Sequence, residues 1–210
     1  MNKVWGHFKT VHNHRWLVFK LSIIAGIPLQ GLVHDLSKYS KTEFFESVKY
    51  YADGKYSPYG KEKKEIGYAP GWLHHKGRNK HHHEYWYDYN APVQAAPMPF
   101  KYFVEMICDN IAAAQNYNKK NFRLEIPLEY FKSNTSKIPM YKGIYKAQEE
   151  VYKQLPKKGI KETIKKDNLR KIYNKYMGDD GNGNQKHKTI SKQQRTIKNN
   201  RTGSNTKNKR

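Results

Sequence analysis

The sequence predicts an all-α protein, a bundle of about six helices followed by a basic C-terminal tail. Apolar residues recur every three or four positions over long segments, as they do in helices that bury one face. Residues that begin and end helices stand at the borders of these segments. No segment shows the convincing alternation of apolar and polar residues that is typical of a strand.

Several of the expected helices have a local signal at their start. Pro28 can open a helix after a turn at Gly26. Ser40 followed by Glu43 forms a capping-box pattern before the run FFESVKYY, which predicts a helix there. The segment PGWLHHKG is long enough for one or two helical turns within an otherwise mixed region. The other helices are expected at residues 3–25, 28–37, 98–117, 139–154 and 159–177.

Composition divides the chain into an all-helical domain, residues 1–178, and a tail, residues 179–210. From Asn182 to Arg210 there are nine Lys or Arg, no acidic residue and two aliphatic residues. Such a segment cannot bury enough apolar area to offset the loss of chain entropy on folding. We therefore expect a disordered basic tail, which either binds nucleic acid weakly or has no specific partner.

The formal charge of the whole chain, +22 at pH 7, favours anionic partners such as nucleic acid or phosphorylated small molecules. A solvated lysine-rich surface is the alternative. Cys108 is the single cysteine, which excludes a disulfide within the chain and fits a cytoplasmic protein. No apolar run approaches the roughly 18 residues of a membrane helix, so no membrane partner is expected.

The segment GLVHDLSK carries the sharpest local signal. His34 and Asp35 stand side by side, and an imidazole nitrogen with a carboxylate oxygen suits Zn, Fe or Mn. The neighbouring apolar residues Leu32, Val33 and Leu36 predict that this part of the chain faces the interior. An exposed His–Asp pair near the end of a helix is the alternative.

A buried carboxylate is costly without a partner, and two residues are placed to supply one. Lys38, three residues after Asp35, can approach the same pocket. His14 can face the His34–Asp35 pair across the turn that follows the first helix. The sequence therefore predicts a polar cluster between the first two helices.

His14, the His34–Asp35 pair and Asp109 in EMICDNIAAA resemble the H…HD…D pattern of the HD superfamily, all-helical metal-dependent phosphohydrolases. HDLSK is similar to their usual HD-hydrophobic-Gly-Lys, with Ser37 in place of glycine. The resemblance implies an HD-like fold in which these four residues hold a divalent metal, Mn, Fe, Zn or Mg, as one or two ions. Because His14 and His34 lie closer in sequence than in typical members, His7 and His12 are alternative first ligands.

Residues 7–131 resemble, more narrowly, an uncharacterised family of small proteins from bacteria and their phages. The matching segments are QGLVHDLSKYSKTEF, GWLHHKGRNKHHHEYWYDY and PMPFKYFVEMICDNIAAAQNY. Proteins of this kind sometimes carry the label catalase. Dimanganese catalases use bridging glutamates and Glu-x-x-His pairs, and no such pair stands near the histidines in this sequence.

The segment WLHHKGRNKHHHEYW holds five histidines within ten positions. In HD proteins with two metal ions, histidines between the HD pair and the last aspartate bind the second ion. The motif H-x3-N-x-H-H of the narrower family selects His75, Asn79, His81 and His82. We expect His75 and His82 to be metal ligands, with His81 in reserve and His83 facing solvent. The alternative for each is a solvated loop histidine.

These inferences favour a metal-dependent phosphohydrolase acting on a phosphate ester, a nucleotide or a related small molecule. Asp35 would bridge or hold the metal ions, while Lys38 and Arg78 would offset negative charge on the phosphoryl group. The first alternative is a non-catalytic nucleic-acid-binding protein, suggested by the charge and by the aromatic run YWY at residues 85–87. The second is a redox enzyme with two metal ions, either di-iron or catalase-like.

Deletion of residues 182–210 should leave the helical content intact and weaken the affinity for DNA or RNA. The deletion removes nine positive charges, so the affinity should also fall less steeply with added salt. Circular dichroism and fluorescence anisotropy at several salt concentrations measure the two effects. A truncated protein that no longer folds would show that the domain extends beyond residue 181.

Overall fold

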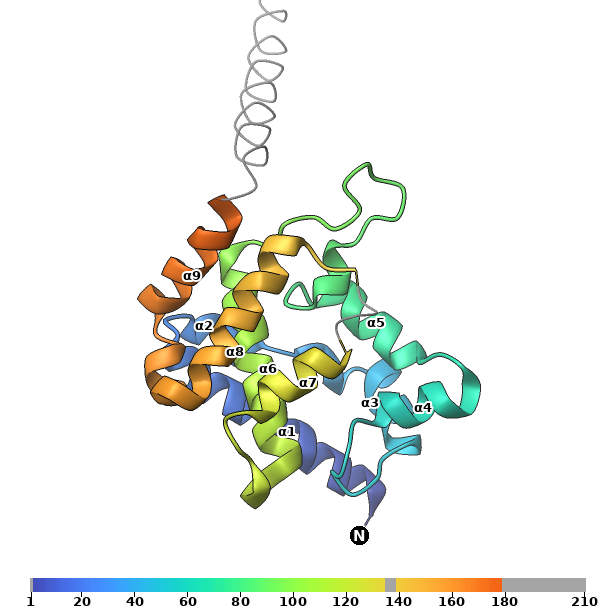
Figure 1. Cartoon of the computed structure of the whole chain (residues 1–210). Coiled ribbons are helices and arrows are strands. Elements are labelled where there is room, and N and C mark those ends of the chain that lie inside the picture. The colour runs from blue at the N-terminus through green and yellow to red at the C-terminus, as the bar shows by residue number, and fades with distance from the viewer. Residues whose placement is uncertain (1, 135–138, 179–210) are drawn as a thin grey trace, which may run out of the picture.

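In the computed structural model, the structure describes residues 2–134 and 139–178, and their regular elements are helices (Figure 1). Within these residues the only strand-like pairing is one isolated bridge between Tyr87 and Ala95, so the predicted all-α fold is confirmed. The α-helices and the short 3-10 helices (η) are, in chain order, α1 (Lys3–Ile24), α2 (Pro28–Val33), η1 (Leu36–Tyr39), α3 (Lys41–Lys49), α4 (Pro58–Ile66), α5 (Pro70–Arg78), η2 (His83–Trp86), α6 (Phe100–Asn118), η3 (Lys119–Asn121), α7 (Ile126–Asn134), α8 (Lys142–Thr163) and α9 (Lys166–Gly178).

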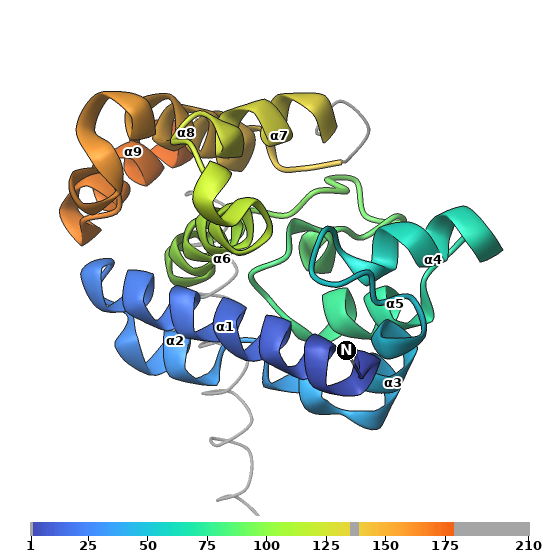
Figure 2. The same ribbon diagram turned by 90° about the horizontal axis from the view of Figure 1, so that it is seen from below.

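Helix α6 lies at the centre of the molecule, between α1 on one side and the pair α8 and α9 on the other (Figure 2). Its apolar residues Phe103, Ile107 and Ile111 are fully buried in the hydrophobic core, as their helical spacing predicts. Because α6 is covered on several sides, two of its acidic residues, Glu105 and Asp109, are buried as well. Buried carboxylates need polar or charged partners, and these partners define the candidate site.

The described residues contain more helices than the six expected from the sequence. The additional ones are α4 and α7, together with α5, which extends the one or two helical turns expected for PGWLHHKG; each is nine residues long. Pro58 and Pro70 each stand in the first turn of their helix, where a missing N–H costs nothing. So short a helix completes fewer than three turns, and its apolar period is therefore hard to detect in sequence.

The helix expected at residues 28–37 ends early, and the prediction that this part of the chain faces the interior holds for the His34–Asp35 pair but not for its apolar neighbours. Helix α2 stops at Val33, and Asp35 has a left-handed backbone with φ of 53° before η1 begins. Leu32, Val33 and Leu36 are more than half exposed, whereas His34 and Asp35 are buried. The prediction assumed a continuous helix through residue 37. The backbone turn at Asp35 breaks the helical period, so the apolar residues point outward and the His34–Asp35 pair points inward.

The C-terminal helices also begin and end at other residues than expected. Helix α8 runs to Thr163 and is kinked at Gly159, whose φ of 72° is left-handed. The sequence predicted a gap between two helices near this point, and the structure has a kink followed by α9 from Lys166. The tail predicted at residues 179–210 lies outside the described residues and stays a prediction.

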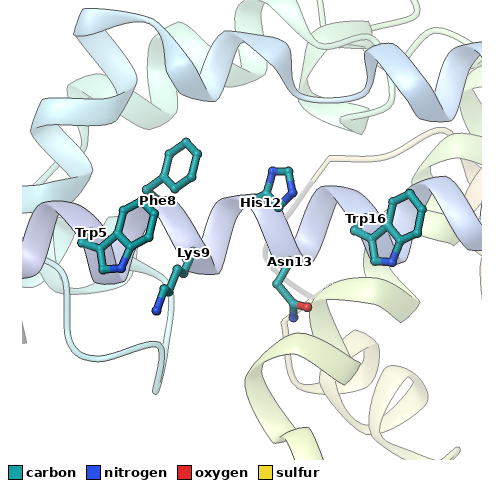
Figure 3. A pocket seen from close by; sticks show the side chains of 6 residues that line it. All are labelled: Trp5, Phe8, Lys9, His12, Asn13 and Trp16. Carbon is teal, nitrogen blue, oxygen red and sulfur yellow. The ribbon is translucent and has the colours of Figure 1, made fainter.

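The outer face of α1 is aromatic and basic. A shallow surface hollow is lined by residues of this one helix, among them Trp5, Lys9 and Trp16 (Figure 3). Both tryptophans are about half exposed. The opposite face of the same helix carries the buried His7 and His14. Among the described helices, none combines the length and the apolar character that crossing a membrane requires.

Substitution of Gly31 by alanine should destabilise the protein, because α2 approaches α1 at this residue without room for a methyl group. An added Cβ would overlap the Ser22 side chain and lie 3.3 Å from Cα of Phe19. We expect a loss of about 1–3 kcal/mol in the free energy of unfolding, measured by urea titration. Gly60→Ala in α4 is the control, since its Cβ meets open space and should stabilise the helix by about 0.5–1 kcal/mol. Equal stability of the two variants would contradict the close packing of α1 and α2.

Candidate metal centre

Four parts of the chain bring a group of histidines and aspartates together. They are α1, the turn between α2 and η1, the segment from α5 to the start of η2, and α6. Two overlapping sets of possible ligands consist of His14, His34, Asp35, His75, His81, His82 and Asp109, and a third set joins His34 and His81 to Glu105. All six residues predicted as metal ligands are therefore in one cluster, together with His81, which was expected only as a reserve.

The turn that ends α2 is what directs the central pair inward. Asp35 has a positive φ, which is uncommon for a residue with a side chain. Arg15 of α1 donates hydrogen bonds from Nε to the carbonyl of His34 (2.7 Å) and from Nη2 to that of Leu32 (2.8 Å). These carbonyls end the helix and have no intrahelical partner. Arg15 thus satisfies the end of α2 and holds the turn in place.

The first set of potential ligands, here called site 1, consists of His14, His34, Asp35 and Asp109. Nε2 of His34 lies 3.2 Å from Oδ2 of Asp35 and 3.6 Å from Oδ1 of Asp109. Nε2 of His14 lies 3.0 Å from the same Asp109 oxygen. One candidate ligand atom from each residue lies within 4.8 Å of all the others, a spacing compatible with a single ion.

The second set, here called site 2, consists of Asp35, His75, His81 and His82. Nε2 of His75 and Nε2 of His81 lie 3.3 and 3.5 Å from Oδ1 of Asp35. Oδ2 of the same carboxylate faces His34 of site 1. Asp35 therefore presents one oxygen to each site, which is the arrangement of a carboxylate that bridges two metal ions.

Among the described residues, the atoms that face the middle of the cluster contact one another without forming hydrogen bonds, and Oδ2 of Asp35 also meets Nζ of Lys38. A buried polar atom without a partner costs free energy, and so many at one point require an explanation. Divalent cations at the two sites would satisfy them, because neutral imidazole nitrogen and carboxylate oxygen are ordinary ligands of Zn, Fe and Mn. The atoms are both carboxylate oxygens of Asp35 and Nε2 of His14, His34, His75, His81 and His82.

On the outer side of the cluster, Nδ1 of three of these imidazoles is bonded to a glutamate. Glu105 of α6 contacts Nδ1 of His34 at 2.9 Å and Nδ1 of His81 at 3.1 Å. Glu43 of α3 contacts Nδ1 of His75 at 2.7 Å. An ionised carboxylate can only accept hydrogen bonds, so Nδ1 of each ring carries the hydrogen. Nε2 is then the atom left free to bind a metal ion. This second ring of carboxylates is the usual support of metal-bound histidine.

A family model described as a family of unknown function, DUF5662, matches residues 3–166. The chain belongs to this family. Among curated proteins, and among solved structures, none matches. The matched residues include the whole cluster and both supporting glutamates, so the candidate centre lies inside the part of the chain that defines the DUF5662 match.

Sequence reasoning missed Glu43 and Glu105 in this DUF5662 protein. Glu43 was interpreted only as the partner of Ser40 in a capping box, and the Ser40 side chain does accept from the Glu43 N–H. The carboxylate itself points inward and is 1% exposed. Glu105 lies one helical turn before Asp109, and that i, i+4 spacing on α6 was the available signal.

The charges of the metal-free cluster are set by burial and by the neighbouring carboxylates. Burial lowers the pKa of His14 and of His82, which keeps both imidazoles neutral. Burial also disfavours a charge on His34, but Asp35 and other carboxylates outweigh it and hold the pKa of His34 well above its ordinary value. Burial raises the pKa of Asp35, but the positive charges of His34 and Lys38 lower it by more. The pKa of Asp35 therefore lies well below its usual range. A bound cation would replace the proton on His34.

Of the two cations predicted to contact substrate, Lys38 belongs to the cluster. Its Nζ lies 2.5 Å from Oδ2 of Asp35, and its side chain is 21% exposed. Arg78 is the last residue of α5, is exposed, and forms no ion pair with the rest of the described chain. The structure therefore does not bring Arg78 to Asp35, and an unpaired guanidinium is more stable in water than in a buried site.

The remaining predicted residues lie outside the two sites. His12 is exposed, and the buried His7 contacts Phe44 and Tyr51, so neither replaces His14 as a ligand. His83 is half-buried beside Glu84 and belongs to neither site. In the aromatic run YWY, the central Trp86 is held by a hydrogen bond from Nε1 to the carbonyl of Lys80, which restrains its ring.

Substitution of Asp35 by asparagine should remove bound metal and destabilise the protein together. Asparagine keeps the shape but not the charge, so His34 and Lys38 lose their buried partner, at a cost of about 3–5 kcal/mol. Metal analysis after purification without chelator and urea unfolding measure the two effects. Glu46→Gln removes a carboxylate from a pair that Glu46 forms with the exposed Lys49 within α3, and it should cost less than about 1 kcal/mol. Full metal occupancy in the Asp35 variant would contradict the assignment.

Proposed function

We propose that this protein is a metal-dependent phosphohydrolase of the HD type, acting on a phosphate ester such as a nucleotide or a related small molecule. The observation that carries the proposal is the convergence of unpartnered Nε2 atoms on the two oxygens of Asp35. Two adjacent ions that share a carboxylate are a recurrent device for hydrolysing phosphate esters.

The ligand types support a transition metal over magnesium. Five imidazoles contribute to the two groups, and imidazole suits Zn, Fe and Mn, whereas Mg prefers oxygen ligands and keeps several waters. Site 1 offers two imidazoles and two carboxylates, and site 2 offers three imidazoles and one carboxylate. We therefore expect Mn, Fe or Zn in the purified protein.

When bound, the ions supply Lewis-acid polarisation of the phosphoryl group and activation of water. The chain's own residues supply position and charge. Asp35 holds the two sites together, and His14 with Asp109 completes the face of site 1 on α1 and α6. Glu43 and Glu105 keep the imidazoles in the tautomer that presents Nε2.

Lys38 is the residue best placed to meet the negative charge of a phosphate ester. It is paired with Asp35, and its side chain is more exposed than those of His14, His34, His75 and His81. Burial lowers the pKa of Lys38, but Asp35 and Asp109 outweigh burial and raise it, so the ammonium group stays charged at any physiological pH. A fixed positive charge beside the ions would bind the phosphoryl oxygens and stabilise charge that develops on them.

A redox reaction is the second candidate, because three imidazoles with one carboxylate also suit iron. The two candidates differ in the metal that they require and in the product that they release. Iron in the purified protein together with oxygen consumption, and no phosphate release, would favour the redox enzyme.

Substitution of His82 by glutamine should abolish hydrolysis of nucleotides and of bis-p-nitrophenyl phosphate in Mn²⁺. The variant loses one of the ligands of site 2, so turnover should fall by more than about 100-fold, beyond the effect of a supporting residue. DNA affinity should hardly change, because His82 faces the cluster. His83→Gln is the matched control, since His83 is adjacent in sequence and belongs to neither site. Release of p-nitrophenol from the diester, or of product from a nucleotide, at the wild-type rate in the His82 variant would contradict the proposal.

A further inference from the structure

One carboxylate oxygen contacts a ligand of each metal site. Oε1 of Glu105 lies 2.9 Å from Nδ1 of His34, a member of site 1, and 3.1 Å from Nδ1 of His81, a member of site 2. The side chain of Glu105 is 7% exposed, so water does not compete freely for these contacts. We propose that Glu105 is a positioning residue for both metal sites and couples them, so that an ion at one site raises the affinity of the other. This inference rests on the metal centre proposed above.

Glu105 fixes the same tautomer in both imidazoles. Its ionised carboxylate accepts hydrogen bonds and cannot donate them, so both Nδ1 atoms carry hydrogen. Nε2 of His34 and of His81 then point inward, 3.2 and 3.5 Å from the oxygens of Asp35, and neither forms a hydrogen bond among the described residues. The two rings also contact each other directly, with centroids 4.5 Å apart, so a change in the orientation of one ring affects the other.

The other oxygen of Glu105 is anchored elsewhere. Nε2 of Gln30 in α2 donates a hydrogen bond to Oε2 of Glu105. Gln30 and His34 lie on the same segment of the chain, four residues apart, whereas Glu105 lies on α6. The orientation of the carboxylate is therefore determined by α2 and α6 together, and Oε1 remains for the two imidazoles.

Glu43 provides a contrast within the same protein. Its two oxygens go to separate rings, Oε1 to Nδ1 of His74 and Oε2 to Nδ1 of His75, each at 2.7 Å. Of these two histidines only His75 belongs to a metal site, and that site is site 2. Glu43 thus supports one site, and Glu105 supports two.

The coupling follows from the shared oxygen. An ion at site 1 fixes the ring of His34, the hydrogen bond then fixes Glu105, and Glu105 fixes His81 before a second ion arrives. The second ion consequently loses less free energy to ordering its ligands, and by linkage the effect is reciprocal. Repulsion between two ions opposes binding at both sites in every variant, so a comparison of Glu105 with Glu43 isolates the contribution of the shared carboxylate.

Titration of Mn²⁺ into metal-free full-length protein tests the proposal. Calorimetry and metal analysis give the number of ions and their affinities, and Co²⁺ absorption spectra report the geometry at each site. In the wild type we expect two ions. In Glu105→Gln both should bind about 10–100-fold more weakly, with both Co²⁺ signals altered. In Glu43→Gln one ion should weaken by that factor, and the affinity and Co²⁺ signal of the other should be retained. A merely structural role of Glu105 would lower stability without changing either affinity.

Each result bears on the proposal. Weakening of one ion only in Glu105→Gln, or of the same ion that Glu43→Gln affects, would overturn the coupling and leave the metal centre intact. A single ion in the wild type would also overturn it. A wild type that binds no divalent ion would overturn both this inference and the proposed function. If Glu105→Gln does not fold, Gln30→Ala is the deciding variant. It should lower the affinity for both ions by the same factor, smaller than that expected for Glu105→Gln. No change, or unequal changes in the two affinities, would overturn the coupling.

Discussion

The burial of the Asp35 carboxylate is the constraint on which the rest of this structure depends. Both oxygens are buried, and an ionised carboxylate in such a place must be offset by positive charge. Lys38 supplies one charge directly, and the surrounding imidazoles can supply the remainder by holding a cation. The path of the chain follows from this, since α1, α5 and α6 each contribute side chains to the same point.

Around that point the polar groups form two shells with opposite roles. Nε2 atoms face inward without partners, and three of the Nδ1 atoms face outward onto Glu43 and Glu105. The outer carboxylates make the inner atoms better ligands and keep each ring from rotating. The same contacts explain why polar residues can occupy the middle of a helical bundle. The carboxylates of the outer shell accept hydrogen bonds from the imidazoles. The inner atoms are placed so that one cation could bind several of them.

The apolar residues around the His34–Asp35 pair show where reasoning from local pattern failed. Leu32, Val33 and Leu36 are the residues that a helical period would bury, yet they are exposed on the outside of the molecule. The left-handed backbone at Asp35 turns these apolar residues outward and the His34–Asp35 pair inward. The hydrogen bonds from Arg15 hold that turn in place. No spacing rule within residues 28–37 could reveal this, because the partner lies on another helix.

The sequence by itself determined the helical class, through the spacing of apolar residues, and most of the candidate metal ligands, through His34–Asp35, the histidine-rich segment and Asp109. These signals are local, since a motif keeps its residue types wherever it lies. Tertiary structure decided which ring nitrogen faces which carboxylate, that His81 joins the cluster while Arg78 does not, and that Glu43 and Glu105 support it. The physical reason is that these contacts join residues more than 20 positions apart, so they exist only after the helices have packed.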